Sequence, residues 1–210
     1  MAVTVDRRWL ARPAVVVAPG LLGAVVASDV GGARVAVQLT EVEAYEGPAD
    51  PASHAFRGRT TRTAVMFGPP GYLYCYFTYG MHWCANIVCG VDGVAAAVLL
   101  RAGEIIEGVE VARARRPASR RDIDLARGPA RLAYCLGVAA GQNGVDLCDP
   151  ASPVRLESRP ARRRAGIVAG PRVGISVATD RAWRFSLADH PTVSAFKAGS
   201  RKRAGRGPAD

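Results

Sequence analysis

The sequence predicts an α+β fold, as one mixed domain with an antiparallel sheet. The chain has 210 residues, 49% of them apolar, which is enough to bury one substantial core. Strict alternation over residues 35–45 indicates a strand, and a meander of three shorter strands is expected between residues 72 and 101. Helical spacing is found over residues 104–116, just before Pro117, and over residues 124–138.

The strand over residues 35–45 carries two carboxylates near its end. Counting by two places Glu41 and Glu43 on the same face as Val37 and Leu39. A carboxylate on an aliphatic face is partly desolvated, which raises its pKa and makes it a stronger base. The pattern by itself favours a plainer interpretation, in which both side chains pass the sheet edge and are solvated. Glu41 is the poorer candidate for a base, and we interpret it as an arginine partner or a solvated carboxylate.

Aromatic residues mark the predicted meander. In residues 72–77 tyrosines alternate with apolar side chains, which predicts a strand with one aromatic face and one core face. Residues 78–82, "TYGMH", form a turn signal in which Gly80 supplies backbone freedom. The returning strand is expected over residues 83–89, and a third, largely buried strand over residues 94–101.

The remaining segments are expected to be connections, further strands and a tail. Residues 47–63 predict a loop, and two strand candidates flank a polar turn at Thr179–Asp180. The apolar run over residues 13–27 resembles a signal peptide, but Pro19–Gly20 interrupts it and it is too short to span a membrane. A structural segment is therefore favoured there. Residues 198–210 predict a basic, disordered tail.

The composition suggests an acidic partner and a reducing compartment. The net charge of +10 favours nucleic acid, although a compositional bias towards Arg explains the same charge. The two lysines, Lys197 and Lys202, lie near the C-terminal end, so the folded body is expected to contain no lysine that could form a Schiff base. The five cysteines include no CxxC pair and are interpreted as reduced thiols of a cytosolic protein. The three histidines lack metal-ligand spacing, and no metal or cofactor is expected.

Several blocks of the sequence together carry a family resemblance. "EVEAYEGPADPASHA" is followed by "MFGPPGYLYCYFTYGMHWCANIV", and "VLLRAGE", "LARGPARLAYCLGV" and "PRVGIS" follow in that order. This set resembles the alkyladenine (3-methyladenine) DNA glycosylases of mammals and many bacteria, which differ from the helix-hairpin-helix type. The resemblance covers residues 12–194. We therefore expect a glycosylase domain over residues 1–197 and a basic tail over residues 198–210.

The resemblance implies a compact domain around a curved antiparallel sheet, with a protruding β-hairpin that intercalates into DNA. It implies a monofunctional enzyme that flips a damaged purine out of duplex DNA and hydrolyses its N-glycosidic bond, leaving an abasic site. The implied substrates are alkylated purines (3-methyladenine and 7-methylguanine), often with hypoxanthine and ethenoadenine. No cofactor is implied. A monomer located in the cytoplasm, at the bacterial nucleoid, is expected.

The resemblance also assigns roles to positions that match the family motifs. Glu43 matches the general base that activates water, and Arg101 matches an arginine that helps to hold this water. Val173, in "PRVGIS", matches a position whose backbone carbonyl contacts the same water. A single carboxylate can both deprotonate water and stabilise the charge that develops on the sugar, which agrees with one essential base.

Further positions match the binding of the flipped base. Tyr45, His54 and Tyr76 match residues that stack on or contact the base, and Asn86 matches the residue that clashes with the 2-amino group of guanine. Tyr79, at the tip of the predicted hairpin, matches the residue that intercalates through the minor groove and fills the gap.

Two features beyond these motifs invite an interpretation. His82 stands where the resemblance leads us to expect an aromatic residue such as Tyr, and it could add a phosphate contact when charged. An arginine-rich segment either follows DNA phosphates or keeps a loop soluble: Arg113, Arg115, Arg116, Arg120 and Arg121. The basic tail is expected to add affinity that does not depend on the DNA sequence.

The sequence leaves two other functions open. A metal-dependent nuclease could use Glu41, Glu43 and Asp50 as Mg²⁺ ligands beside the basic segments. No additional acidic motif completes such a site convincingly. A catalytically silent module that binds damaged DNA would use the same basic surface and the same hairpin.

Overall fold

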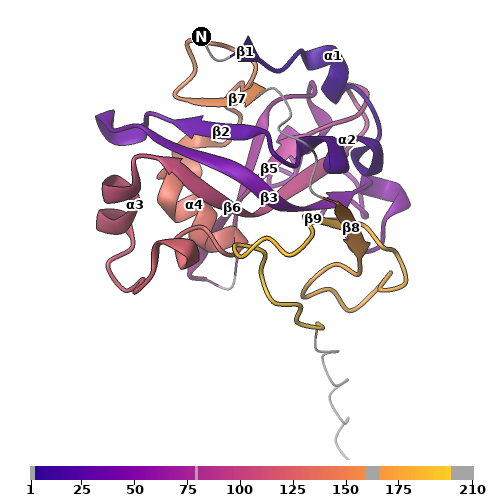
Figure 1. The fold of residues 1–210 in the computed structure, drawn as a ribbon. Helices are drawn as coiled ribbons and strands as arrows, with labels where there is room; N and C mark the ends of the chain where they lie inside the picture. Colours follow the sequence, from indigo (N-terminus) through magenta and orange to yellow (C-terminus); the bar gives the residue numbers. More distant parts are fainter. Residues whose placement is uncertain (1–2, 79, 159–165, 200–210) are drawn as a thin grey trace, which may run out of the picture.

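The computed structural model describes residues 3–78, 80–158 and 166–199, and an antiparallel sheet dominates it (Figure 1). The main path of the sheet runs β1-β7-β2-β3-β6-β5-β4. β9 pairs with the later residues of β3, and β8 pairs with β9. The strands of the described chain are β1 Val3–Thr4, β2 Val25–Ser28, β3 Val35–Tyr45, β4 Leu73–Thr78, β5 His82–Val88, β6 Ala97–Glu107, β7 Val154–Ser158, β8 Ile167–Gly170 and β9 Arg184–Leu187.

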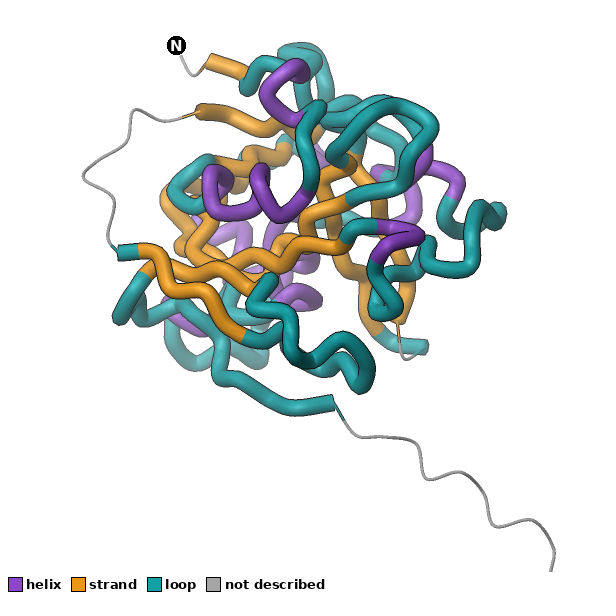
Figure 2. Tube along the Cα trace, turned by 90° about the vertical axis from the view of Figure 1, so that its right-hand side faces the viewer, coloured by secondary structure: helices purple, strands orange, loops and turns teal. Residues whose placement is uncertain are grey.

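Short helices surround the sheet, and Figure 2 shows the strands gathered in the middle with helices and loops around them. α2 packs on β3, whereas α4 packs on β5 and β6, and both helices contribute to the same buried core. This mixture of a central sheet and peripheral helices confirms the predicted α+β fold. The α-helices are α1 Arg7–Leu10, α2 Ala14–Leu21, α3 Val109–Arg115 and α4 Pro129–Leu136, and 3-10 turns occur at Val30–Gly32, Gly47–Ala49, Ala64–Phe67, Asp122–Asp124 and Ala140–Gln142.

β3 is the middle strand of the main path of the sheet, and its bounds are those that the alternation predicted. β6 pairs along one of its edges, while β2 and then β9 pair along the other. Nearly every residue of β3 is therefore buried, on both faces. The plainer interpretation of its two carboxylates, as solvated side chains past the sheet edge, is wrong because Glu41 and Glu43 are fully buried.

The predicted meander is confirmed, since β4, β5 and β6 are antiparallel neighbours joined in sequence order. The helix predicted over residues 104–116 is only partly correct. β6 continues to Glu107, because Ile105 and Glu107 still pair with β3, and α3 begins only after Gly108. The apparent helical spacing of residues 104–107 is overridden by this tertiary pairing.

The segment after β8 also differs from the prediction. Of the two strand candidates around Thr179–Asp180, the second becomes β9, but residues 171–183 form a loop. Val173 directs its N–H to a side chain on β3, and Gly174 has a left-handed φ of 75° that a regular strand does not accommodate. This loop is one wall of the site described below.

The apolar N-terminal run is a structural segment, as expected. It supplies α2 and β2, whose side chains are part of the buried core. Among the described residues there is no helix with the length and apolar character needed to cross a membrane.

Candidate active site

A cavity of about 510 Å³ lies beside the end of β3. Its walls come from β3, the hairpin of β4 and β5, the first half of β6, the loop over residues 51–54 and the loop over residues 173–177. This size is within the usual range of small-molecule pockets. Six residues to which the family motifs assign a role line this one cavity: Tyr45, His54, Tyr76, Asn86, Arg101 and Val173.

Glu43 lies directly behind this wall, with its side chain fully buried. Its Oε1 accepts a hydrogen bond from the backbone N–H of Val173 at 2.6 Å and lies 3.4 Å from Nη1 of Arg101. Its Oε2 accepts a hydrogen bond from the Tyr45 hydroxyl at 2.8 Å. The three residues that hold the carboxylate are therefore all residues of the cavity wall.

The environment of Glu43 disfavours its charged form. Burial raises the pKa of the carboxyl, and the opposing effects of Arg101, Val173 and Tyr45 do not fully offset it. The phenol of Tyr45 is affected in the same direction, because burial and the nearby carboxylate raise its pKa well above the ordinary value. Tyr45 is therefore a hydrogen-bond donor to Glu43 throughout the physiological pH range.

Glu41 lies two residues earlier on the same face, but its surroundings are different. Its Oε1 accepts hydrogen bonds from Nε of Arg101 at 2.9 Å and from Nε of Arg184 at 2.6 Å. Its Oε2 accepts one from the backbone N–H of Ser194 at 2.7 Å. Burial by itself would raise the pKa of Glu41, but these partners outweigh it, and the pKa is lowered. The interpretation as an arginine partner is confirmed, and the carboxylate is not solvated.

Aromatic side chains form part of the cavity wall. The His54 ring packs edge-on against Tyr76 with ring centres 4.5 Å apart, and its Nδ1 lies 3.2 Å from the Tyr74 hydroxyl. Arg62 lies over the Tyr76 ring at 5.6 Å. Burial against these rings, together with the charge of Arg62, lowers the pKa of His54 to about 4, although part of the ring stays exposed. His54 is therefore a neutral contact at physiological pH. Tyr74 also lines the cavity.

Asn86, on β5, also lines the cavity. Its side chain is buried, and its Nδ2 donates a hydrogen bond to the backbone carbonyl of Tyr74 at 3.1 Å. This bond fixes the plane of the amide, so that any ligand in the cavity meets a rigid polar group rather than a mobile one.

The comparisons with known proteins agree with this geometry. The family model described as methylpurine-DNA glycosylase matches residues 8–191. The chain belongs to this family. Relatives in Nocardia farcinica and Streptomyces avermitilis are 54% and 50% identical; they cover 84% and 94% of this chain, which in turn covers 84% and 93% of theirs. A relative in Mycobacterium tuberculosis is 49% identical, over 96% of this chain and 98% of its own length, and all three carry the name "Putative 3-methyladenine DNA glycosylase".

As a methylpurine-DNA glycosylase, the chain is a hydrolase of DNA base excision repair. The nuclease interpretation is not supported by the carboxylates on which it depended. Glu41 is engaged by two guanidinium groups, and both oxygens of Asp50 are hydrogen-bonded to Arg172, at 2.5 and 2.8 Å. Within the described residues no group of three His, Cys, Asp or Glu side chains has the arrangement of a metal site.

The intercalating residue expected for this family cannot be placed, because Tyr79 lies outside the described residues. Its neighbours on the hairpin, Phe77 and Met81, are exposed apolar side chains. His82 lies at the start of β5 and lines the cavity, with its ring edge-on to Tyr134 at 6.3 Å. Its contact with a DNA phosphate stays a prediction.

Much of the arginine-rich segment has a structural role in this glycosylase. Arg115 donates to the carbonyls of Cys135 and Val30, and Arg116 donates to those of Asp124 and Leu125. Arg113 and Arg121 form ion pairs with Asp122 and Asp124 respectively. Nearer the cavity, the loop that carries His54 has three exposed arginines: Arg57, Arg59 and Arg62.

Sequence inspection missed residues that hold the carboxylates of Glu41 and Asp50. Arg184 and Ser194 bind Glu41, and Arg172 pairs with Asp50 behind Tyr45. Each partner lies more than a hundred positions away in the sequence, so no local pattern reveals these contacts. The only available signal was that Arg172 immediately precedes Val173 in a family block.

Proposed function

We propose that the protein excises alkylated purines, with 3-methyladenine as a principal substrate, from duplex DNA by a hydrolysis in which Glu43 is the general base. One observation supports this most strongly. A buried carboxylate, disfavoured in its charged form, lies directly behind a cavity with aromatic walls. The names of the relatives support the methylated base.

The chemistry follows from the position of Glu43. A water oxygen attacks C1′ of the flipped nucleotide, its proton passes to Glu43, and the electrons of the glycosidic bond leave with the base. The anionic carboxylate also stabilises the positive charge that develops on the sugar. Arg101 keeps Glu43 in place and helps to hold the water, together with the backbone of Val173.

An alkylated purine needs little assistance to leave. 3-Methyladenine and 7-methylguanine carry a positive charge in the nucleotide, so the base departs neutral when the glycosidic bond breaks. Electron-poor rings also stack well on the walls formed by Tyr45, His54 and Tyr76. Hypoxanthine and ethenoadenine fit the same slot and are proposed as further substrates. The rigid amide of Asn86 disfavours a purine with a 2-amino group, a mismatch worth about 1–3 kcal/mol. This mismatch excludes guanine, which is uncharged and a poor leaving group, whereas the positive charge of 7-methylguanine makes it a good enough leaving group to offset the same mismatch.

The product is an abasic site without strand cleavage. A bifunctional glycosylase forms a Schiff base through an amine, and the cavity is lined by no lysine among the described residues. The hairpin of β4 and β5, on which Phe77 and Met81 are exposed, supplies the wedge, and Tyr79, which lies between these two strands in the sequence, is the residue proposed to intercalate.

The test uses duplex oligonucleotides with a central hypoxanthine or ethenoadenine, and methylated DNA from which free 3-methyladenine is measured. Wild type, Glu43→Gln and the surface variant Glu110→Gln are compared in EDTA, and abasic sites are revealed by hot alkali. We expect wild type and Glu110→Gln to release bases without a prior strand break, and Glu43→Gln to be slower by on the order of 10²–10⁴-fold. Full activity of Glu43→Gln would refute its role as base. Binding without release by wild type would favour the silent module.

A further inference from the structure

The pair of Arg172 and Asp50 is the least expected feature near the cavity. Both side chains are inaccessible to solvent, and the guanidinium contacts both carboxylate oxygens, at 2.5 and 2.8 Å. The Nε of Arg172 is buried without a hydrogen-bond partner among the described residues. Burying an ion pair costs desolvation energy that its attraction often fails to offset, and an unsatisfied donor adds to this cost. Stability alone therefore gives a poor account of the pair.

The first link between Arg172 and the base is through the backbone. Arg172 immediately precedes Val173, whose N–H donates to Glu43 Oε1 at 2.6 Å. The Nη1 of Arg172 also donates to the carbonyl of Ala44, the residue after Glu43, at 2.9 Å. Val173 belongs to the loop between β8 and β9, which is not held by the backbone hydrogen bonds of a β-sheet. The guanidinium therefore joins this loop to β3 at the position of the base.

The second link is through an aromatic ring. The guanidinium of Arg172 lies 4.6 Å from the ring centre of Tyr45 and 5.2 Å from that of Trp183. Because Tyr45 lines the cavity and Arg172 does not, the ring separates the guanidinium from the cavity. One face of Tyr45 is thus fixed by a cation–π contact, while its hydroxyl donates to Glu43 Oε2 at 2.8 Å.

We propose that Arg172, held by Asp50, is a positioning residue that fixes both hydrogen-bond donors of Glu43, one on each carboxylate oxygen. This inference rests on the proposed role of Glu43 as the base. Both donors favour the ionised carboxylate, since the N–H of Val173 and the hydroxyl of Tyr45 each lower the pKa of Glu43. A variant in which Arg172 no longer fixes these two donors should therefore have a Glu43 carboxyl that is harder to ionise and less precisely positioned.

The test is the pH dependence of single-turnover excision of hypoxanthine from about pH 5 to about pH 8, in wild type and Arg172→Lys. Lysine keeps the positive charge but lacks the planar guanidinium group, which donates to Asp50 and to the Ala44 carbonyl at the same time. We expect the acidic limb of the profile, which reports ionisation of the base, to move to higher pH in the variant. A shift of one pH unit corresponds to a tenfold loss of rate on that limb.

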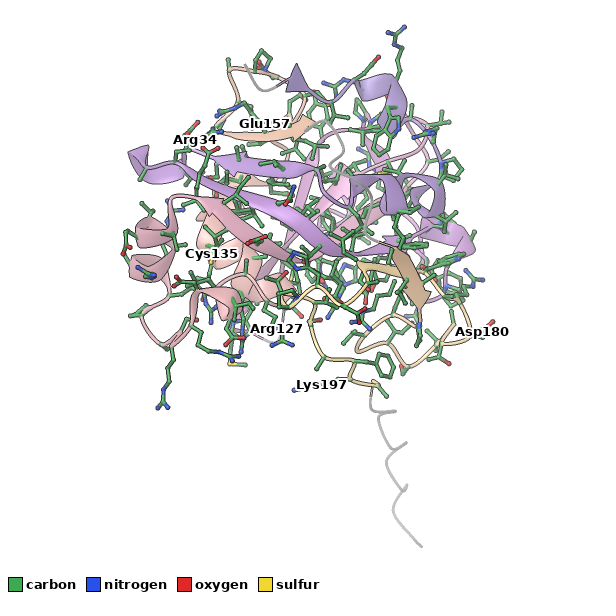
Figure 3. The ribbon with its side chains drawn as sticks, viewed as in Figure 1. Arg34, Arg127, Cys135, Glu157, Asp180 and Lys197 are labelled. Atoms are coloured by element: carbon green, nitrogen blue, oxygen red, sulfur yellow. The ribbon has the colours of Figure 1, made fainter. Side chains whose placement is uncertain are left out.

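Arg155→Lys is the matched control. Arg155 also combines a carboxylate, that of Asp29, with a backbone carbonyl, that of Ser152. It lies on β7, the strand that carries Glu157 in Figure 3, and it does not line the cavity. We expect this variant to lose thermal stability without any movement of the acidic limb. If Arg172→Lys behaves in the same way, with a lower rate or stability and an unmoved limb, the pair is merely structural and the proposal is wrong.

Two further variants keep the outcome clear. If Arg172→Lys does not fold, Asp50→Asn is measured instead, because it keeps the side-chain shape while weakening the hold on Arg172; an unmoved limb overturns the proposal equally. Glu43→Gln separates this inference from the proposed function. If that variant is inactive and the limb of Arg172→Lys matches that of wild type, only the positioning role fails, whereas an active Glu43→Gln removes the proposed base itself.

Discussion

Two glutamates on one face of a strand have opposite electrostatic environments in this protein. Burial dominates at Glu43 and raises its pKa, while two arginines and Ser194 dominate at Glu41 and lower its pKa. The first carboxylate thereby retains a tendency to take up a proton, which a base requires, and the second is a fixed anion that holds Arg101. This difference predicts that replacing each glutamate by glutamine has opposite effects on the stability of the folded protein, although the two positions are only two residues apart.

Glu43→Gln should stabilise the protein at neutral pH. The pKa of Glu43 is higher in the folded protein than its ordinary value of 4.5, so the folded state binds the proton more tightly and loses stability as the pH rises through the folded pKa. Glutamine removes this cost. Thermal unfolding should show a higher Tm for the variant at pH 7, by about 2–4 °C for each kcal/mol, and no gain below about pH 4.5. An unchanged or lower Tm at pH 7 would contradict this.

Glu41→Gln should have the reverse effect. The pKa of Glu41 is lowered on folding, so its contribution to stability is present above the ordinary value of 4.5 and is lost as the pH falls through the folded pKa. The variant leaves the part-buried Arg184 without its anion and leaves Glu43 as the remaining carboxylate beside the buried Arg101, at a cost of about 3–5 kcal/mol. Denaturant unfolding at pH 7 and at acidic pH tests this, and a loss that does not shrink in acid would count against it.

The residues that could be predicted from the sequence were those carried by strand parity and by the family blocks. Parity placed Glu41 and Glu43 on one face, and the blocks named six residues that line one cavity. Neither could show that Glu41 is bound by Arg184 and Ser194, because these partners come from β9 and the loop after it. Long-range ion pairs have no periodic signature, which is also why Arg172 and Asp50 were missed.

At the scale of elements, the local sequence pattern predicted a strand or helix correctly where the strand pairing in the folded protein agreed with that pattern. The bounds of β3 match the alternation, whereas the helical spacing after Arg101 gave way to a longer β6. Gly103 makes this longer pairing possible: a Cβ at this position would lie 2.3 Å from Val37 Cγ1 and 2.5 Å from the carbonyl oxygen of Gln38. The close approach of β6 to β3 holds Arg101 beside the glutamates.

Gly103→Ala should therefore separate β6 from β3 and destabilise the protein. Overpacking of this kind costs about 1–3 kcal/mol, and we expect a lower Tm together with slower excision through misplacement of Arg101. Gly141→Ala is the control, because a Cβ there meets no atom within 4 Å and its φ is not left-handed. Equal Tm values for the two variants would show that the sheet tolerates the added methyl group.

For the whole molecule, net charge is a poor guide to where DNA binds. The charge of +10 suggested a basic surface, but several arginines serve the fold through backbone carbonyls or buried carboxylates, as Arg115, Arg116 and Arg172 show. In Figure 3, Arg127 and Lys197 lie on the side away from Arg34 and Glu157. The loop that carries His54 has exposed arginines at 57, 59 and 62, and Arg62 lies 5.6 Å from the ring centre of Tyr76, a residue of the cavity wall.

This distribution predicts which arginines set the salt dependence of DNA binding. Arg57 and Arg59 are exposed in that loop, whereas Arg113 is paired with Asp122. Each phosphate contact contributes a slope of about −0.9 to the plot of log affinity against log salt concentration. The double variant Arg57→Gln and Arg59→Gln should therefore bind undamaged duplex more weakly and with a shallower slope, while Arg113→Gln keeps the slope of wild type. Because the two arginines lie outside the base-holding contacts of Glu43, single-turnover excision at saturating enzyme should change little. If the double variant and wild type have the same slope, Arg57 and Arg59 do not contact DNA phosphates, and the DNA-binding surface lies elsewhere.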